Sequence, residues 1–120
     1  MILIIGGAYQ GKLDFAKTTF GITEADVYTC GNGEIDFSKR CICKIEEFTF
    51  ACDDPIAYFE SHRQQWQNSI LICQDIFCGV VPMGEENRKW RQKTGRLAQY
   101  LSREASQVSR IFCGLEQRLK

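Results

Sequence analysis

The sequence predicts an α/β domain with a mainly parallel β-sheet and helices on both of its faces. The first observation behind this prediction is the order of the segments, because apolar, strand-like runs alternate with segments of helical periodicity. The second is that the apolar runs are uninterrupted, which is typical of strands buried on both faces of a parallel sheet. Ligands of such sheets bind at the carboxyl ends of the strands.

Each expected strand or helix has a local signal for its type. Asp53 and Asp54 before Pro55 are a typical helix start, because a carboxylate caps the first turn and proline suits the first helical position. Gly21 is a typical helix end. The expected elements in chain order are a strand over 2–5, a helix over 12–20, a strand over 26–30, a helix from 55 to 66, a strand over 70–73, a loop over 79–82, a helix over 86–105, a strand over 108–113 and a final strand over 115–119.

The segment from residue 35 to residue 50 gives a mixed signal. Residues 41–45 and 48–50 alternate as strands do, but two glutamates at 46 and 47 interrupt the pattern. Three phenylalanines, Phe48, Phe50 and Phe77, could lie in the core or in an interface, and the core is the preferred interpretation.

Length and composition limit the possible classes of protein. The 120 residues suit one domain over 1–120, and fifteen basic side chains balance fifteen acidic ones, so no general attraction to nucleic acid is expected. The apolar start is too short for a signal peptide or a membrane span, which favours a cytoplasmic protein. Seven cysteines without a C-x-x-C pair favour buried thiols over a metal site or a disulfide framework.

A glycine loop that ends in lysine joins the first expected strand to the first expected helix. Main-chain N–H groups of such a loop, the helix N-terminus and the lysine charge together bind phosphate groups. The loop therefore predicts a nucleotide site, with Lys12 also in a catalytic role. A glycine turn that binds no nucleotide is the alternative. The residues expected to contact the nucleotide are Gly6, Gly7, Ala8, Tyr9, Gln10, Gly11, Lys12 and Leu13.

One part of such a loop is missing. A hydroxyl side chain that coordinates Mg²⁺ normally follows the lysine, but Leu13 stands there. Asp75, which follows the apolar strand at 70–73, is the candidate catalytic carboxylate and metal ligand, and a strand-end residue that caps a loop is the alternative. His62, the one histidine of the chain, is expected on a solvated surface.

Three motifs of the chain resemble those of one enzyme family. They are Ile2-Leu-Ile-Ile-Gly-Gly-Ala-Tyr-Gln-Gly-Lys12, Gln74-Asp-Ile-Phe-Cys-Gly-Val-Val-Pro82 and Trp90-Arg-Gln-Lys-Thr-Gly-Arg-Leu-Ala-Gln99. Over residues 1–30 and 70–120 the chain resembles the bifunctional adenosylcobinamide kinase / adenosylcobinamide-phosphate guanylyltransferase family of cobalamin synthesis. The resemblance implies a recombinase-type P-loop fold, and phosphorylation of a cobinamide hydroxyl with ATP or GTP and Mg²⁺. It further implies GMP transfer through a guanylylated histidine and a possible homo-oligomer.

The chain departs from that family at positions that bear on the chemistry. Family members are longer, and the part expected to be missing here carries their histidine and a further strand with an acidic residue. His62 does not match that histidine, Leu13 replaces the loop serine, and Gln92 replaces an aspartate. The resemblance therefore implies a shortened member that binds a nucleoside triphosphate, without guanylyl transfer. An inactive relative that serves as a binding or assembly subunit is the alternative.

Overall fold

The fold of the chain is given by a computed structural model, which describes residues 1–76 and 84–120. Phe77 and the loop predicted over 79–82 lie outside the described residues. The elements in chain order are β1 (Ile2–Gly6), α1 (Lys12–Phe20), a 3₁₀ turn (Glu24–Asp26), β2 (Val27–Thr29), β3 (Cys41–Cys43), α2 (Ile45–Ala51), α3 (Pro55–Ser61), α4 (Arg63–Trp66), β4 (Ile70–Gln74), α5 (Glu85–Glu104), β5 (Gln107–Phe112) and β6 (Leu115–Arg118).

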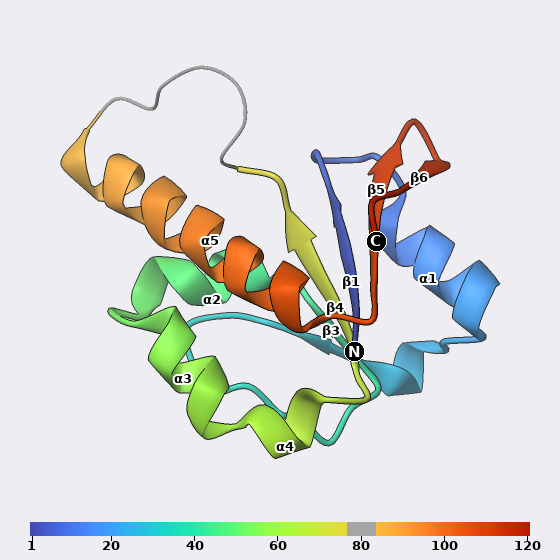
Figure 1. Cartoon of the computed structure of the whole chain (residues 1–120), viewed down its shortest axis with the longest axis horizontal. Coiled ribbons are helices and arrows are strands. Elements are labelled where there is room, and N and C mark those ends of the chain that lie inside the picture. Colours follow the sequence, from blue (N-terminus) through green and yellow to red (C-terminus); the bar gives the residue numbers. More distant parts are fainter. Residues whose placement is uncertain (77–83) are drawn as a thin grey trace.

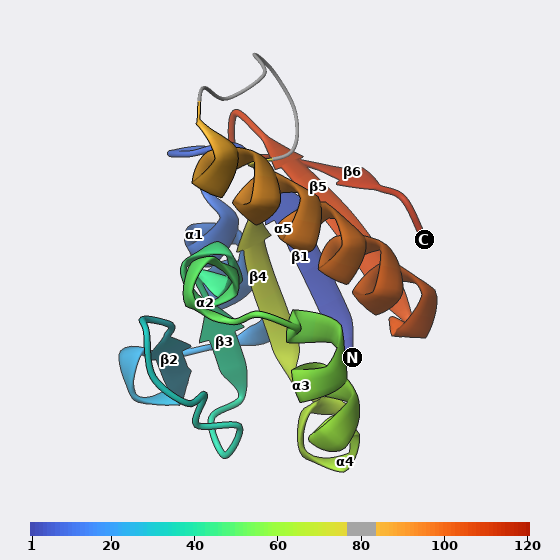
Figure 2. The same ribbon diagram turned by 90° about the vertical axis from the view of Figure 1, so that its left-hand side faces the viewer.

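The predicted α/β architecture is confirmed. One sheet has the strand order β2-β3-β4-β1-β5-β6, and every neighbouring pair is parallel except β5 and β6, which form an antiparallel hairpin. In Figure 1, where the sheet is seen nearly edge-on, α1 lies on one side and α2, α3 and α5 lie on the other. Figure 2 shows the second group of helices in front of the strands.

Apolar side chains of the strands fill a core on each face of the sheet. Successive residues of a strand point to opposite faces, so Ile42 packs with the residues beneath α2, α3 and α5, whereas Cys41 and Cys43 pack towards α1. The larger core lies on the side with more helices and contains Phe59 and Trp66, both almost fully buried. Burial on both faces of the sheet thus explains why the strand sequences are apolar without interruption.

The predicted strand over residues 48–50 is wrong, because these residues belong to α2. The strand β3 ends before Lys44, whose left-handed backbone (φ 57°) turns the chain into the helix. Ile45, Phe48 and Thr49 then share the buried face of α2, with the spacing of a helix rather than of a strand. Phe48 lies in the core as predicted, but Phe50 is 49 % exposed and packs edge-on against Trp90.

The predicted helix over residues 55–66 is present in two pieces. Asp54 begins α3, and its Oδ1 accepts a hydrogen bond from the main-chain N–H of Ala57 at 3.2 Å, as the Asp-Asp-Pro signal predicts. Helix α3 ends at Ser61, His62 caps it, and α4 starts at Arg63. Over the described part of the chain, no helix is long and apolar enough to cross a membrane.

Candidate functional site

The carboxyl ends of β1, β3 and β4 surround a cavity of about 670 Å³. The glycine loop forms one wall, and the ends of β3 and β4 form the other. The cavity is therefore at the edge of the sheet where a ligand was expected. Its lining residues are Ala8, Tyr9, Gln10, Gly11, Lys12, Leu13, Asp14, Cys43, Lys44, Glu46, Ile72 and Gln74.

The structure brings the predicted site residues together. Every predicted loop residue except Gly6 and Gly7 lines the cavity. Asp75 does not line the cavity, but it is next to the loop, because its main-chain N–H donates a hydrogen bond to the Gly6 main-chain oxygen at 2.7 Å. This proximity follows from the parallel pairing of β1 with β4, in which Gly6 lies opposite Gln74.

The glycine loop is held in place by the turn between β5 and β6. The Gln10 side-chain oxygen accepts the N–H of Cys113 at 2.5 Å, and the Gln10 main-chain oxygen accepts the N–H of Gly114 at 2.9 Å. Figure 1 shows the loop and the hairpin turn side by side. The conformation of the loop therefore depends on a contact with the other end of the sequence.

Residues with a left-handed backbone conformation lie on or next to the wall of this cavity. Within residues 1–76 and 84–120, three residues other than glycine have positive φ: Tyr9, Lys44 and Cys113. Tyr9 and Lys44 line the cavity, and Cys113 contacts the loop through Gln10. Such a conformation costs a side-chain-bearing residue on the order of 1 kcal/mol, and it tends to persist where function requires it.

Lys12 is the predicted phosphate-binding cation, and its ammonium group is positioned by the loop itself. Its Nζ donates a hydrogen bond to the Gly7 oxygen at 2.6 Å. Burial lowers the pKa of Lys12 below its usual 10.5, and the nearby charges of Glu46 and Asp75 act in the opposite direction. A positive charge that is partly removed from water in a cavity is well placed to attract an anion.

Glu46 is a site residue that the sequence analysis missed. It is only 5 % exposed, lines the cavity, and accepts the main-chain N–H of Gln74 on its Oε1 at 2.8 Å. Its main-chain oxygen accepts the indole N–H of Trp90 at 2.7 Å. Glu46 thus adds an acidic residue just after β3, at the same edge of the sheet as the glycine loop. The helical spacing of Ile45, Phe48 and Thr49 was the sequence pattern that could have predicted α2 and, with it, the position of Glu46.

The residues around the cavity fit a magnesium ion only in part. Leu13 offers no oxygen ligand, and among the described residues no group of three or more His, Cys, Asp or Glu side chains is placed to hold a metal ion. Asp75 fits better, because its Oδ1 is buried and has no hydrogen-bond partner among residues 1–76 and 84–120. A nucleotide-bound Mg²⁺ needs only one or two protein carboxylates, so Asp75 would hold an ion that arrives with phosphate groups.

His62 is part of the supporting structure rather than of this cavity. Its ring packs against those of Tyr58 and Phe37, with centroid distances of 4.4 and 5.4 Å. Its Nδ1 lies 2.7 Å from the main-chain oxygen of Tyr58. It stands where α3 meets α4, and α4 leads into the amino end of β4. We expected a solvated side chain, but the structure shows it half-buried against these rings.

One comparison with known proteins finds a family. Residues 37–119 match the model of a family described as cobinamide kinase / cobinamide phosphate guanyltransferase. The matched range begins after the glycine loop and contains β3, Glu46, β4, α5 and the β5–β6 hairpin. No individual curated protein matches the chain.

Proposed function

The chain belongs to the cobinamide kinase / cobinamide phosphate guanyltransferase family, and we propose that it binds the triphosphate of GTP or ATP in the cavity below its glycine loop. In this proposal the chain acts as a kinase-like transferase of cobalamin synthesis. The observation that supports it best is the position of Lys12, which lines the cavity at the end of a glycine loop and at the carboxyl edge of the sheet.

The proposed reaction moves a phosphoryl group from the nucleotide to a hydroxyl group of a cobinamide. The acceptor oxygen forms a bond to the terminal phosphorus, and the bond from that phosphorus to the bridging oxygen breaks. Lys12 would balance the charge of the phosphate oxygens, and Asp75, which lies beside the glycine loop, would accept the hydroxyl proton or hold the metal. When bound, Mg²⁺ would neutralise charge between the terminal phosphates.

Only the kinase half of the family chemistry is proposed. GMP transfer through histidine needs an imidazole beside the nucleotide, but His62 lies where α3 meets α4. Figure 1 shows that junction at the end of the molecule opposite the glycine loop. The contacts of His62 with Tyr58 and Phe37 support a structural role for its ring.

A second candidate function is that of a relative that binds without catalysis. The observation that favours it is Leu13, which lines the cavity where a hydroxyl ligand of the metal would normally be. A chain with this change keeps the phosphate-binding loop but has one metal ligand less. It would serve as a binding or assembly subunit in the same pathway.

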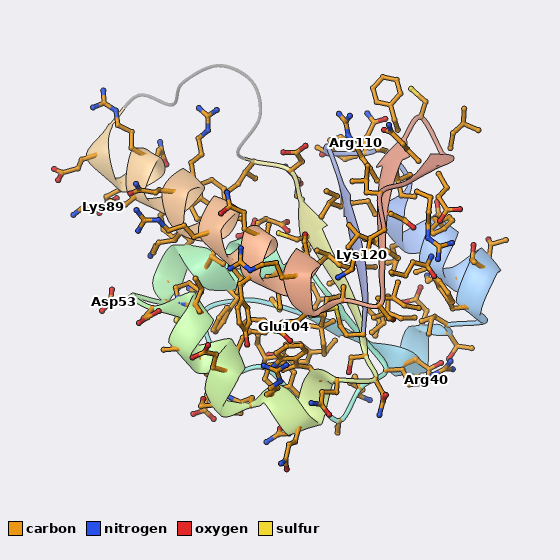
Figure 3. All side chains as sticks on the ribbon, viewed as in Figure 1. Arg40, Asp53, Lys89, Glu104, Arg110 and Lys120 are labelled. Atoms are coloured by element: carbon orange, nitrogen blue, oxygen red, sulfur yellow. The ribbon has the colours of Figure 1, made fainter. Side chains whose placement is uncertain are left out.

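Calorimetric titration with GTP and with ATP, each with Mg²⁺ and with EDTA, tests the binding proposal. We expect micromolar binding that Lys12→Ala abolishes or weakens at least about tenfold, which corresponds to about 1.4 kcal/mol. Lys89→Ala is the control, because Lys89 lies on α5 away from α1 and does not line the cavity (Figure 3). If neither nucleotide binds under either condition, the proposal is wrong.

Mass spectrometry of adenosylcobinamide, incubated with the protein, nucleotide and Mg²⁺, separates the two candidate functions. A phosphorylated product supports the kinase and excludes the inactive relative. Binding without product supports the inactive relative. Leu13→Ser then tests the missing ligand, because a restored hydroxyl should strengthen Mg²⁺-dependent binding if its loss weakened the metal site.

A further inference from the structure

Lys44 is a second lysine on the wall of the cavity, opposite the glycine loop. It follows the last residue of β3, and β3 is separated from β1 by β4 alone. Lys12, at the end of the loop that leaves β1, and Lys44 therefore approach the same space from two sides, and both line it. Lys44 was not predicted as a site residue, because it lies in a segment whose sequence pattern does not mark the end of a strand.

The backbone of Lys44 has a conformation that glycine adopts more easily. Its φ and ψ are 57° and 44°, in the left-handed region, where a β-carbon is strained. Glycine or asparagine would form this turn at lower cost, so a requirement for the turn does not explain why the residue is lysine. Strained residues concentrate at functional sites, and this one lines the candidate site.

The ammonium group of Lys44 is available to a ligand. The side chain is exposed, and within the described residues it forms no hydrogen bond or ion pair. The carboxylate of the neighbouring cavity residue Glu46 is directed towards β4 rather than towards Lys44, because its Oε1 accepts the main-chain N–H of Gln74. The ammonium group can therefore bind an anion that enters the cavity, and lysine commonly binds phosphate as a point charge.

We propose that Lys44 is a second phosphate-binding cation, which contacts the same polyphosphate group as Lys12. It supplies positive charge in a cavity where Leu13 cannot help to hold a metal ion. This inference deepens the proposed function and rests on the binding of phosphate groups in the cavity. It does not depend on the identity of the nucleotide base or on catalysis.

The test uses Lys44→Gly in the full chain, with inorganic triphosphate, GTP and ATP as probes, each in EDTA and in Mg²⁺. We expect the variant to bind each probe that the unmodified protein binds about tenfold more weakly in EDTA, as for the loss of about 1.4 kcal/mol. Its melting temperature without ligand should rise, because glycine relieves the left-handed strain. Lys44→Asn, which removes the charge and tolerates the conformation, should reproduce the loss of affinity, and Lys89→Ala should not.

The outcomes separate this inference from the proposed function. Unchanged affinity of Lys44→Gly and Lys44→Asn for triphosphate would overturn the role of Lys44. If the unmodified protein binds triphosphate but not GTP or ATP, and the Lys44 variants lose that binding, the inference stands and the nucleotide proposal fails. If the unmodified protein binds none of the probes, both are wrong.

Discussion

Gly6 in β1 lies so close to Ile111 in β5 that a β-carbon at position 6 would be 2.6 Å from the Ile111 main-chain oxygen. β-Carbons do not approach main-chain oxygens this closely, so β1 or β5 must move when the side chain is added. We expect Gly6→Ala to lower the free energy of unfolding by about 2 kcal/mol, as for other overpacked cores. Urea denaturation measures this change.

Gly7→Ala is the matched control for that substitution. A β-carbon at position 7 would be 3.5 Å from the Gln10 Cγ, which is an ordinary contact. The free energy of unfolding should therefore change by less than about 0.5 kcal/mol. Equal losses for the two variants would show that the distance between β1 and β5 is not what requires glycine.

The affinity of the cavity for phosphate is expected to depend on pH through Lys12. Only the ammonium form of the side chain attracts phosphate, and burial lowers its pKa below 10.5. Once the triphosphate itself is fully ionised, its affinity should fall as the pH rises through that lowered pKa. Lys12→Arg should make the fall smaller, because a guanidinium group stays charged. Calorimetry between neutral and alkaline pH makes the measurement, and an identical fall in the arginine variant would contradict this assignment.

A buried pair of threonines joins α2 to α5. The Thr49 and Thr94 hydroxyl oxygens lie 2.6 Å apart, both side chains are fully buried, and the Thr94 hydroxyl donates to the Trp90 oxygen at 2.8 Å. Thr94→Val keeps the shape and leaves Thr49 without this partner, so we expect a loss of about 1–2 kcal/mol in the free energy of unfolding. Thr18→Val on the exposed face of α1 is the control. If both variants are equally stable, the hydroxyl pair contributes nothing.

The described cysteines should differ widely in reactivity. Burial raises the pKa of Cys30 and of Cys41 to about 12, so both remain protonated near neutral pH, whereas Cys113 is exposed. A short pulse of iodoacetamide followed by peptide mass spectrometry should label Cys113 long before Cys30 or Cys41. All three should react at similar rates in denaturant. Rapid native labelling of Cys41 would show that the face beneath α1 opens readily.

The position of the candidate site could be predicted from the sequence, because it follows from topology. An apolar strand, a glycine loop and a helix indicate β1 and α1, and a second apolar strand before Asp75 indicates β4. Parallel strands end at the same edge of a sheet, which brings Asp75 to Gly6. Predicting the positions of these residues required no knowledge of side-chain packing.

The opposite wall of the cavity could not be predicted with the same rules. β3 has only three residues, and the turn into α2 depends on a left-handed Lys44, a conformation that lysine does not signal. Phe48 and Phe50 suggested a strand because they alternate, yet the buried positions follow helical spacing. Glu46 was consequently read as an interruption, although its burial and its bond to Gln74 make it part of the wall.

The bond from Cys113 to the Gln10 side chain joins residues 103 positions apart. During synthesis the ribosome therefore releases the glycine loop long before the hairpin turn that holds it. A nascent chain that ends within α5 contains every predicted loop residue but lacks the partner that fixes their shape. Capacity to retain phosphate should accordingly arise only after the β5–β6 turn has been synthesised and has left the ribosome.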